Sequence, residues 1–142
     1  MKHHAIIRIA AKFLIPPILL FALYVQFHGD FGPGGGFQAG VLFAVGFILY
    51  ALMSGLTAAE HALPVSAVRI CLASGVLIYA GVGVACMLLG GRFLEYDVLA
   101  KDGHAGQHLG ILLVELGVGV TVFGVMVAVF YAFAGRRRET DR

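Results

Sequence analysis

The chain has 142 residues, of which 60% are hydrophobic and only 13% are charged, about half the charged share of an ordinary soluble domain. A soluble domain of this length would lack the polar residues needed to cover its surface, so the composition indicates a single membrane domain over residues 1–142. The net charge of +2 comes without a basic stripe interleaved with aromatic residues, which excludes a nucleic-acid-binding surface.

The first apolar run extends from Ile6 to Phe27 and predicts a transmembrane helix. Pro16 and Pro17 lie one turn after the basic residues at its start, so we expect the first third of the helix to be irregular. A secretory signal is excluded because the run is too long and no small-x-small cleavage site follows it.

The stretch from His28 to Gly40, HGDFGPGGGFQAG, separates the first two apolar runs. A phosphate-binding loop would need Lys and Ser or Thr after the last glycine, and a dinucleotide-binding loop would need a preceding strand, so neither fits. The glycines and Pro33 instead predict a sharp turn. His28 and Asp30 are candidates for proton transfer in this turn, beside the simpler interpretation that the stretch is only structural.

The second and third apolar runs, residues 36–57 and 70–91, each have the length of a membrane span. In the second run, small residues recur every four positions at Gly36, Gly40 and Ala44. This spacing allows two helix backbones to approach closely, so the second span is expected to be tightly packed.

The fourth run, residues 106–134, contains Glu115 within its apolar part. Helical periodicity places Glu115 on one side together with His104 and His108, opposite a face of small residues. An intramembrane carboxylate must face protein, water or a cation, so Glu115 is either a station for protons or cations, supplied through the two histidines, or a hydrogen-bonding strut. Zinc binding by His104 and His108 would lack further ligands, and a haem held by His28 and His108 is a third, weaker hypothesis.

Four spans place both termini on one side of the membrane, and this side has eight of the ten basic residues. Because cytoplasmic loops retain Lys and Arg, both termini are predicted to be cytoplasmic. Since fewer than 50 residues lie outside the spans, there is no room for a soluble catalytic domain. The chain is therefore expected to be no enzyme, to need no cofactor and to hold no metal.

Two stretches, FHGDFGPGGGFQAGVLFA and ELGVGVTVFGVMVAVF, resemble the B subunit (MnhB type) of multisubunit Mrp cation/proton antiporters and the related module of membrane-bound hydrogenases. Where this family commonly has Gly-His before its glycine core, this chain has His28, Gly29 and Asp30. The residues that match the motifs of the family are Pro33, Gly34, Gly35, Gly36, Phe37 and Gly40 in the first stretch and Glu115, Gly117 and Gly119 in the second.

The resemblance implies an accessory subunit in a hetero-oligomeric complex of the cell (inner) membrane that exchanges Na⁺ for H⁺ and supports pH and salt homeostasis. We expect the glycine faces to be covered by other subunits, because they offer more packing surface than four helices use among themselves. The alternatives are the corresponding subunit of a hydrogenase-linked ion pump and a stand-alone four-helix cation exporter.

Overall fold

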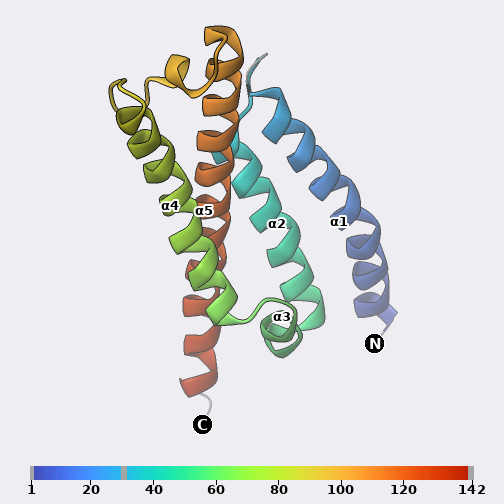
Figure 1. Ribbon diagram of the computed structural model, residues 1–142. Coiled ribbons are helices and arrows are strands. Elements are labelled where there is room, and N and C mark those ends of the chain that lie inside the picture. Colours follow the sequence, from blue (N-terminus) through green and yellow to red (C-terminus); the bar gives the residue numbers. More distant parts are fainter. Residues whose placement is uncertain (1, 30–31, 141–142) are drawn as a thin grey trace.

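The structure is a computed structural model that describes residues 2–29 and 32–140, with side chains for residues 6–29 and 32–136. All elements in the described part are helical (Figure 1). They are α1 (Lys2–His28), α2 (Gly36–Ser54), α3 (Leu56–Ala62), α4 (Val65–Leu88), the 3-10 helix η1 (Tyr96–Leu99) and α5 (Gly103–Thr140). Within this part, four helices are long and apolar enough to cross a membrane, namely α1, α2, α4 and α5.

These four helices confirm the prediction of an all-helical chain with four candidate spans, and they differ from the predicted spans at their ends. The expectation of an irregular first third in α1 is wrong, because the helix is continuous through Pro16 and Pro17. Transmembrane helices tolerate proline where neighbouring groups compensate for the lost backbone hydrogen bond. The third span begins at Val65 instead of residue 70, and the short helix α3, which the sequence analysis did not predict, precedes it.

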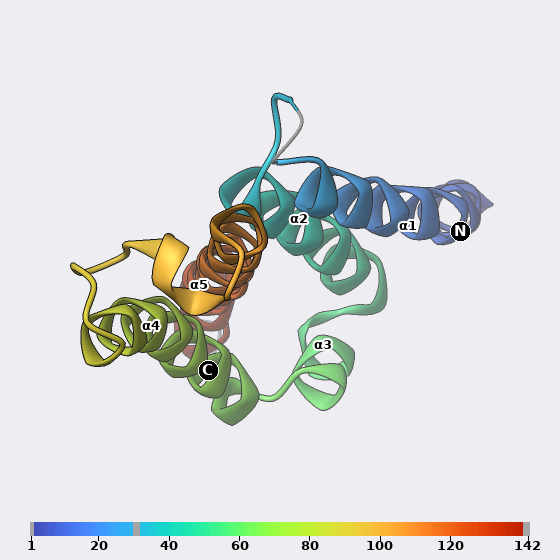
Figure 2. The same cartoon turned by 45° about the horizontal axis from the view of Figure 1, so that its top comes forward.

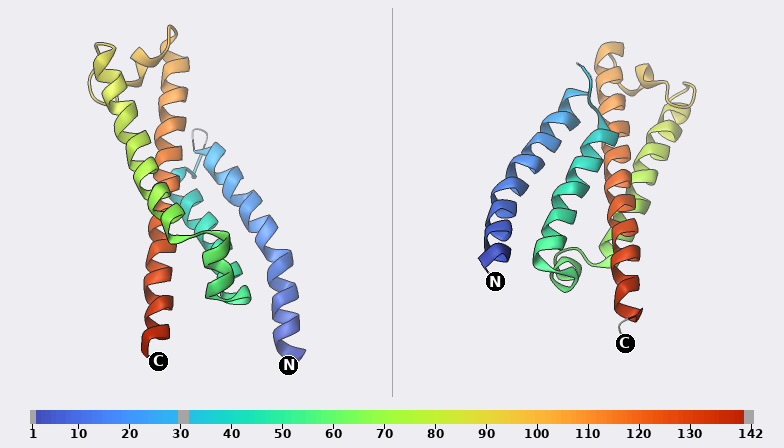
Figure 3. Two further views of the ribbon diagram at one scale, coloured as in Figure 1. Left: turned by 60° about the horizontal axis from the view of Figure 1, so that its bottom comes forward. Right: turned by 180° about the vertical axis from the view of Figure 1, so that it is seen from behind.

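The helices form an open row in which α5 lies between α2 and α4, and α1 packs against α2 (Figure 2). A buried cluster near the end of the molecule that holds the termini joins α2, α3, α4 and α5; it includes Ala44, Ala59, Val68 and Val127. The first and last described residues lie at the same end of the molecule (Figure 3). The row leaves α1 and α4 on its two flanks, each with wide apolar surfaces exposed.

The small residues are used for packing within the chain. A Cβ added to Gly40 would lie 2.5 Å from the carbonyl oxygen of Gly119, and one added to Gly75 would lie 2.6 Å from that of Gly117. Glycine therefore brings α2 and α4 into backbone contact with α5 from its two sides. The expectation that other proteins cover these glycine faces is wrong at these positions, because α5 fills both grooves.

Candidate functional site

Glu115 lies inside the membrane span rather than at its end. Two positions further along α5, Gly117 packs against the α4 backbone at Gly75 and Tyr79, close to the middle of that helix. At a rise of about 1.5 Å per residue, Glu115 lies only about 3 Å from this level. A carboxylate at this depth is costly unless protein groups, water or a cation surround it.

The glycine turn between α1 and α2 surrounds part of the Glu115 side chain. A Cβ added to Gly29 would collide with both carboxylate oxygens, and one added to Gly35 would lie 2.9 Å from Oε1. Gly35 has a φ of 122°, a conformation that glycine adopts far more easily than other residues. Glycine at these two positions therefore provides both the space and the backbone geometry that let the turn approach the carboxylate.

The same contact places the Glu115 carboxylate at the N-terminus of α2, for which Gly35 is the capping residue. The first N–H groups of a helix have no acceptor within the helix, and this end has a partial positive charge that attracts anions. Directly after this cap, Gly36 packs against the α5 backbone at Glu115, and one turn later Gly40 packs against it at Gly119. The two motifs found in the sequence thus form the two sides of one helix contact.

His28 is the last residue of α1 and is half-buried. Its ring stacks on Tyr24 with the ring centroids 5.0 Å apart, and its carbonyl accepts a hydrogen bond from the backbone N–H of Gly32 at 3.2 Å. His28 directly precedes Gly29 and so lies next to the segment that contacts Glu115. Asp30, the other candidate in this turn, lies outside the described residues.

His104 and His108 are both exposed near the start of α5. They lie on the same side of the helix as Glu115, about 16 Å and about 10 Å from it along the axis. The structure therefore does not bring them into one cluster with the carboxylate. Of the other motif residues, Pro33 and Phe37 are exposed.

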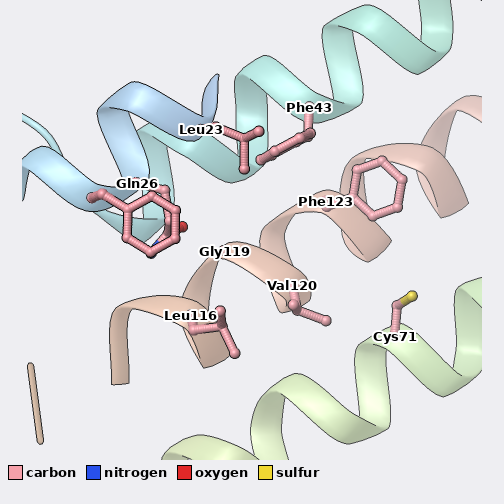
Figure 4. A pocket seen from close by; sticks show the side chains of 9 residues that line it. Leu23, Gln26, Phe43, Cys71, Leu116, Gly119, Val120 and Phe123 are labelled. Atoms are coloured by element: carbon pink, nitrogen blue, oxygen red, sulfur yellow. The ribbon is translucent and has the colours of Figure 1, made fainter. Parts of the chain in front are cut away.

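Gln26 is a polar residue near this site that the sequence analysis missed. It is only 7% exposed, and its Nε2 has no hydrogen-bond acceptor among the described residues. A Cβ added to Gly119 would lie 2.8 Å from Oε1 of Gln26, which places the amide one turn of α5 from Glu115. Gln26 also lines an otherwise apolar pocket of about 300 Å³ between α1, α2, α4 and α5, which includes Phe43 and Phe123 (Figure 4).

Comparison with known proteins identifies the family of the chain. Residues 6–128 match the family described as a domain related to the MnhB subunit of Na⁺/H⁺ antiporters. The chain belongs to the MnhB family. Among its relatives in this family are proteins of three Staphylococcus aureus strains, Newman, JH1 and Mu3, with the provisional name antiporter subunit mnhB2. Each is 32% identical over 139 residues, covering 96% of this chain and 98% of the relative.

Membership of the MnhB family confirms the resemblance seen in the sequence. The chain is a subunit of a Na⁺/H⁺ antiporter complex and a multi-pass protein of the cell membrane. The names of the relatives do not favour the alternatives of a hydrogenase-linked subunit or a stand-alone exporter. Within the described residues, no group of three or more His, Cys, Asp or Glu side chains is arranged to hold a metal ion.

Proposed function

We propose that Glu115 is the residue of this MnhB-family subunit that binds the exchanged cation or proton during transport. The observation that supports this role is the contact of its carboxylate with Gly29 and Gly35 at the N-terminus of α2. The helix end stabilises the ionised carboxylate at this place within the span, so a proton or cation that binds Glu115 can also be released again.

His104 and His108 extend the proposed path along α5 toward the end of the molecule opposite the termini. Eight of the ten basic residues lie on the terminal side, which by the positive-inside rule is cytoplasmic. Glu115 would then be reached from the outer side of the membrane, first through His104 and then through His108. His28 would stand beside this path at the end of α1.

The chain would act as an accessory subunit with no catalytic chemistry of its own. In the described spans, Glu115 is the single acidic residue in the apolar middle, whereas a complete exchanger needs a path through the whole membrane. Other subunits would supply the rest of the path, and they would contact the flanks of the row at α1 and α4. The transported ions would be Na⁺ and H⁺, as the family description indicates.

The direct test is Glu115→Gln in the complete antiporter complex, reconstituted in vesicles with a pH-sensitive dye. Gln keeps the size of Glu but removes the titratable charge, so we expect Na⁺-driven proton flux to fall about a hundredfold or more, the scale on which proton-transfer groups act. Co-purification of all subunits should be unchanged, since the carboxamide preserves the packing against Gly29 and Gly35.

Glu95→Gln is the matched control, because Glu95 is an exposed carboxylate in the loop between α4 and α5, where it accepts a hydrogen bond from the backbone N–H of Arg92 at 2.6 Å. This variant should keep full flux. Full flux in an assembled Glu115→Gln complex would instead show that Glu115 is a strut between α5 and the glycine turn.

A further inference from the structure

A second apolar groove, of about 440 Å³, lies between the first two turns of α4 and residues 128–132 of α5. Val65 and Leu72 line it from α4, and Ala128 and Ala132 line it from α5. The charged residue in its wall is Arg69. The groove is therefore apolar except for one cation, and Arg69 lies about midway along its α4 wall.

Arg69 has no internal counter-charge in the described part of the chain. Its side chain is exposed, and no hydrogen bond or ion pair to it is found there. Glu60 on α3 interacts electrostatically with the phenol of Tyr131, another residue of the groove wall. No ion pair joins Glu60 to Arg69. The Tyr131 hydroxyl is already used, since it donates a hydrogen bond to the carbonyl of Leu63 at 2.8 Å.

The depth of Arg69 along the span favours the binding of an anion. Arg69 lies four residues after the start of α4, about 6 Å into the helix, where a long basic side chain reaches toward the membrane surface. The groups found at that depth are the phosphates of phospholipids, and guanidinium binds phosphate through paired hydrogen bonds. From Arg69 the apolar lining continues for one turn toward the middle of the span, at Leu72 and Ala128, which is the direction that an acyl chain takes from its headgroup.

We propose that this groove binds an anionic phospholipid, with one acyl chain between α4 and α5 and the phosphate on Arg69. Charge complementarity supports this occupant over a neutral lipid, because the groove combines an unpaired cation with apolar walls. Basic side chains near a membrane surface also attract anionic lipids in general, so a specific site must be distinguished from this diffuse attraction. The proposal does not rest on the role of Glu115, since its readout is lipid binding and not transport.

The experiment uses the complete antiporter complex in lipid nanodiscs that contain phosphatidylglycerol with a photoactivatable group in one acyl chain. After illumination, labelled peptides are mapped by mass spectrometry. We expect labelling within residues 65–72 and 128–132, and less labelling there by a phosphatidylcholine probe with the same acyl chains. Arg69→Gln should lower the phosphatidylglycerol labelling about fivefold, the effect of one basic residue near the membrane surface.

Two further variants separate a groove site from diffuse attraction. Ala128→Phe fills the groove but keeps the charge of Arg69, so it should also lower the labelling. Lys12→Gln removes an exposed cation on α1, outside this groove, and should leave the labelling unchanged. Equal labelling by the two lipids, equal losses in Arg69→Gln and Lys12→Gln, or cross-links from the groove to another subunit in place of lipid would each overturn the proposal.

Discussion

Gly36 makes a contact between α2 and α5 that no other residue could make. A Cβ at this position would collide with the backbone carbonyl of Glu115, which belongs to a helix and cannot move independently. Gly81, in α4, is a useful contrast, because a Cβ added there would meet nothing within 4 Å. Gly36 is the first residue of α2 and Gly81 lies inside α4, and the space available for a side chain differs completely between them.

Alanine at these two positions should therefore have opposite effects. Gly81→Ala should leave the free energy of unfolding unchanged or raise it by up to about 1 kcal/mol, since alanine favours the helix. Gly36→Ala should lower the free energy of unfolding by about 1–3 kcal/mol, because the added methyl group overpacks the contact with α5. It should also lower transport, because it displaces Glu115. Melting of the purified complex, followed by size-exclusion chromatography, measures both. Similar melting temperatures for the two variants would contradict the close α2–α5 contact.

At the scale of single residues, the sequence predicted Glu115 and the glycine motif but not that they touch. The contact between Gly35 and Glu115 joins positions far apart in the chain, and neither motif alone contains that information. Gln26 has no ionisable group, whereas the predicted site consists of ionisable residues alone. An amide within an apolar run is itself costly to bury, and this cost was the signal that could have identified it.

Tyr96 connects the helices at the end of the molecule opposite the termini. Its ring packs over Gly110, and its carbonyl oxygen lies close to Gly106, so η1 closes against the first turns of α5. On the other side, the ring of Phe93 fills the space beside Gly83 of α4. Burial raises the pKa of the Tyr96 phenol above its ordinary value, and Tyr79 and Cys86 raise it further. The phenol is therefore neutral well above physiological pH, so ionisation of Tyr96 does not disturb its packing against Gly110 in that range.

The closure can be tested by proteolysis of the loop between α4 and α5, which has two trypsin sites, Arg92 and Lys101. Tyr96→Ala removes the ring from Gly110 and should speed cleavage at these sites several-fold, because it costs part of the roughly 3–5 kcal/mol of a fully buried aromatic ring. Tyr96→Phe keeps the ring and should be cleaved at the wild-type rate. Equal rates for the Ala and wild-type chains would show that the ring does not hold the loop.

At the scale of helices, length and hydropathy were sufficient to predict the candidate spans, because an apolar run of about 20 residues rarely forms anything other than a membrane-spanning helix. Their ends were less predictable. The third span was expected to begin after Arg69, whereas the helix begins at Val65 and includes that residue. A long basic side chain can reach the surface from within a span, so charge alone is a poor marker of a helix end. The seven residues of α3 are too few to give a periodic signal.

The whole molecule is an open row of spanning helices and not a closed bundle. The glycine faces were expected to pack against other proteins. Instead, the glycine faces of α2 and α4 pack against the two sides of α5 within the chain. Large apolar side chains on α1 and α4 remain exposed, and either lipid or other subunits can cover such surfaces. The sequence could not distinguish the two uses of glycine, because helix spacing shows which residues share a face but not which helix covers it.

The proposed orientation of this row predicts which loops face the cytoplasm. Cysteine in place of Lys101, between η1 and α5, should react with a membrane-impermeant maleimide added to intact cells. Cysteine in place of His61, an exposed residue of α3, should react only after the membrane is permeabilised. The parent chain with Cys71 and Cys86 alone serves as the background. The reverse order of labelling would place the termini outside and would require the proposed path to Glu115 to open on the cytoplasmic side.

The backbone contact between α2 and α5 also limits how this protein can evolve. Every other amino acid has a Cβ, so positions such as Gly36 and Gly40 have no conservative replacement, and a change of the amino acid there is expected to be eliminated by selection. Outward-facing leucines and valines can exchange with one another at little cost. Among distant relatives, the lipid-facing residues should therefore vary freely, whereas the glycines at the α2–α5 contact should be kept. These glycines should be the positions by which the most distant members of the family can still be aligned.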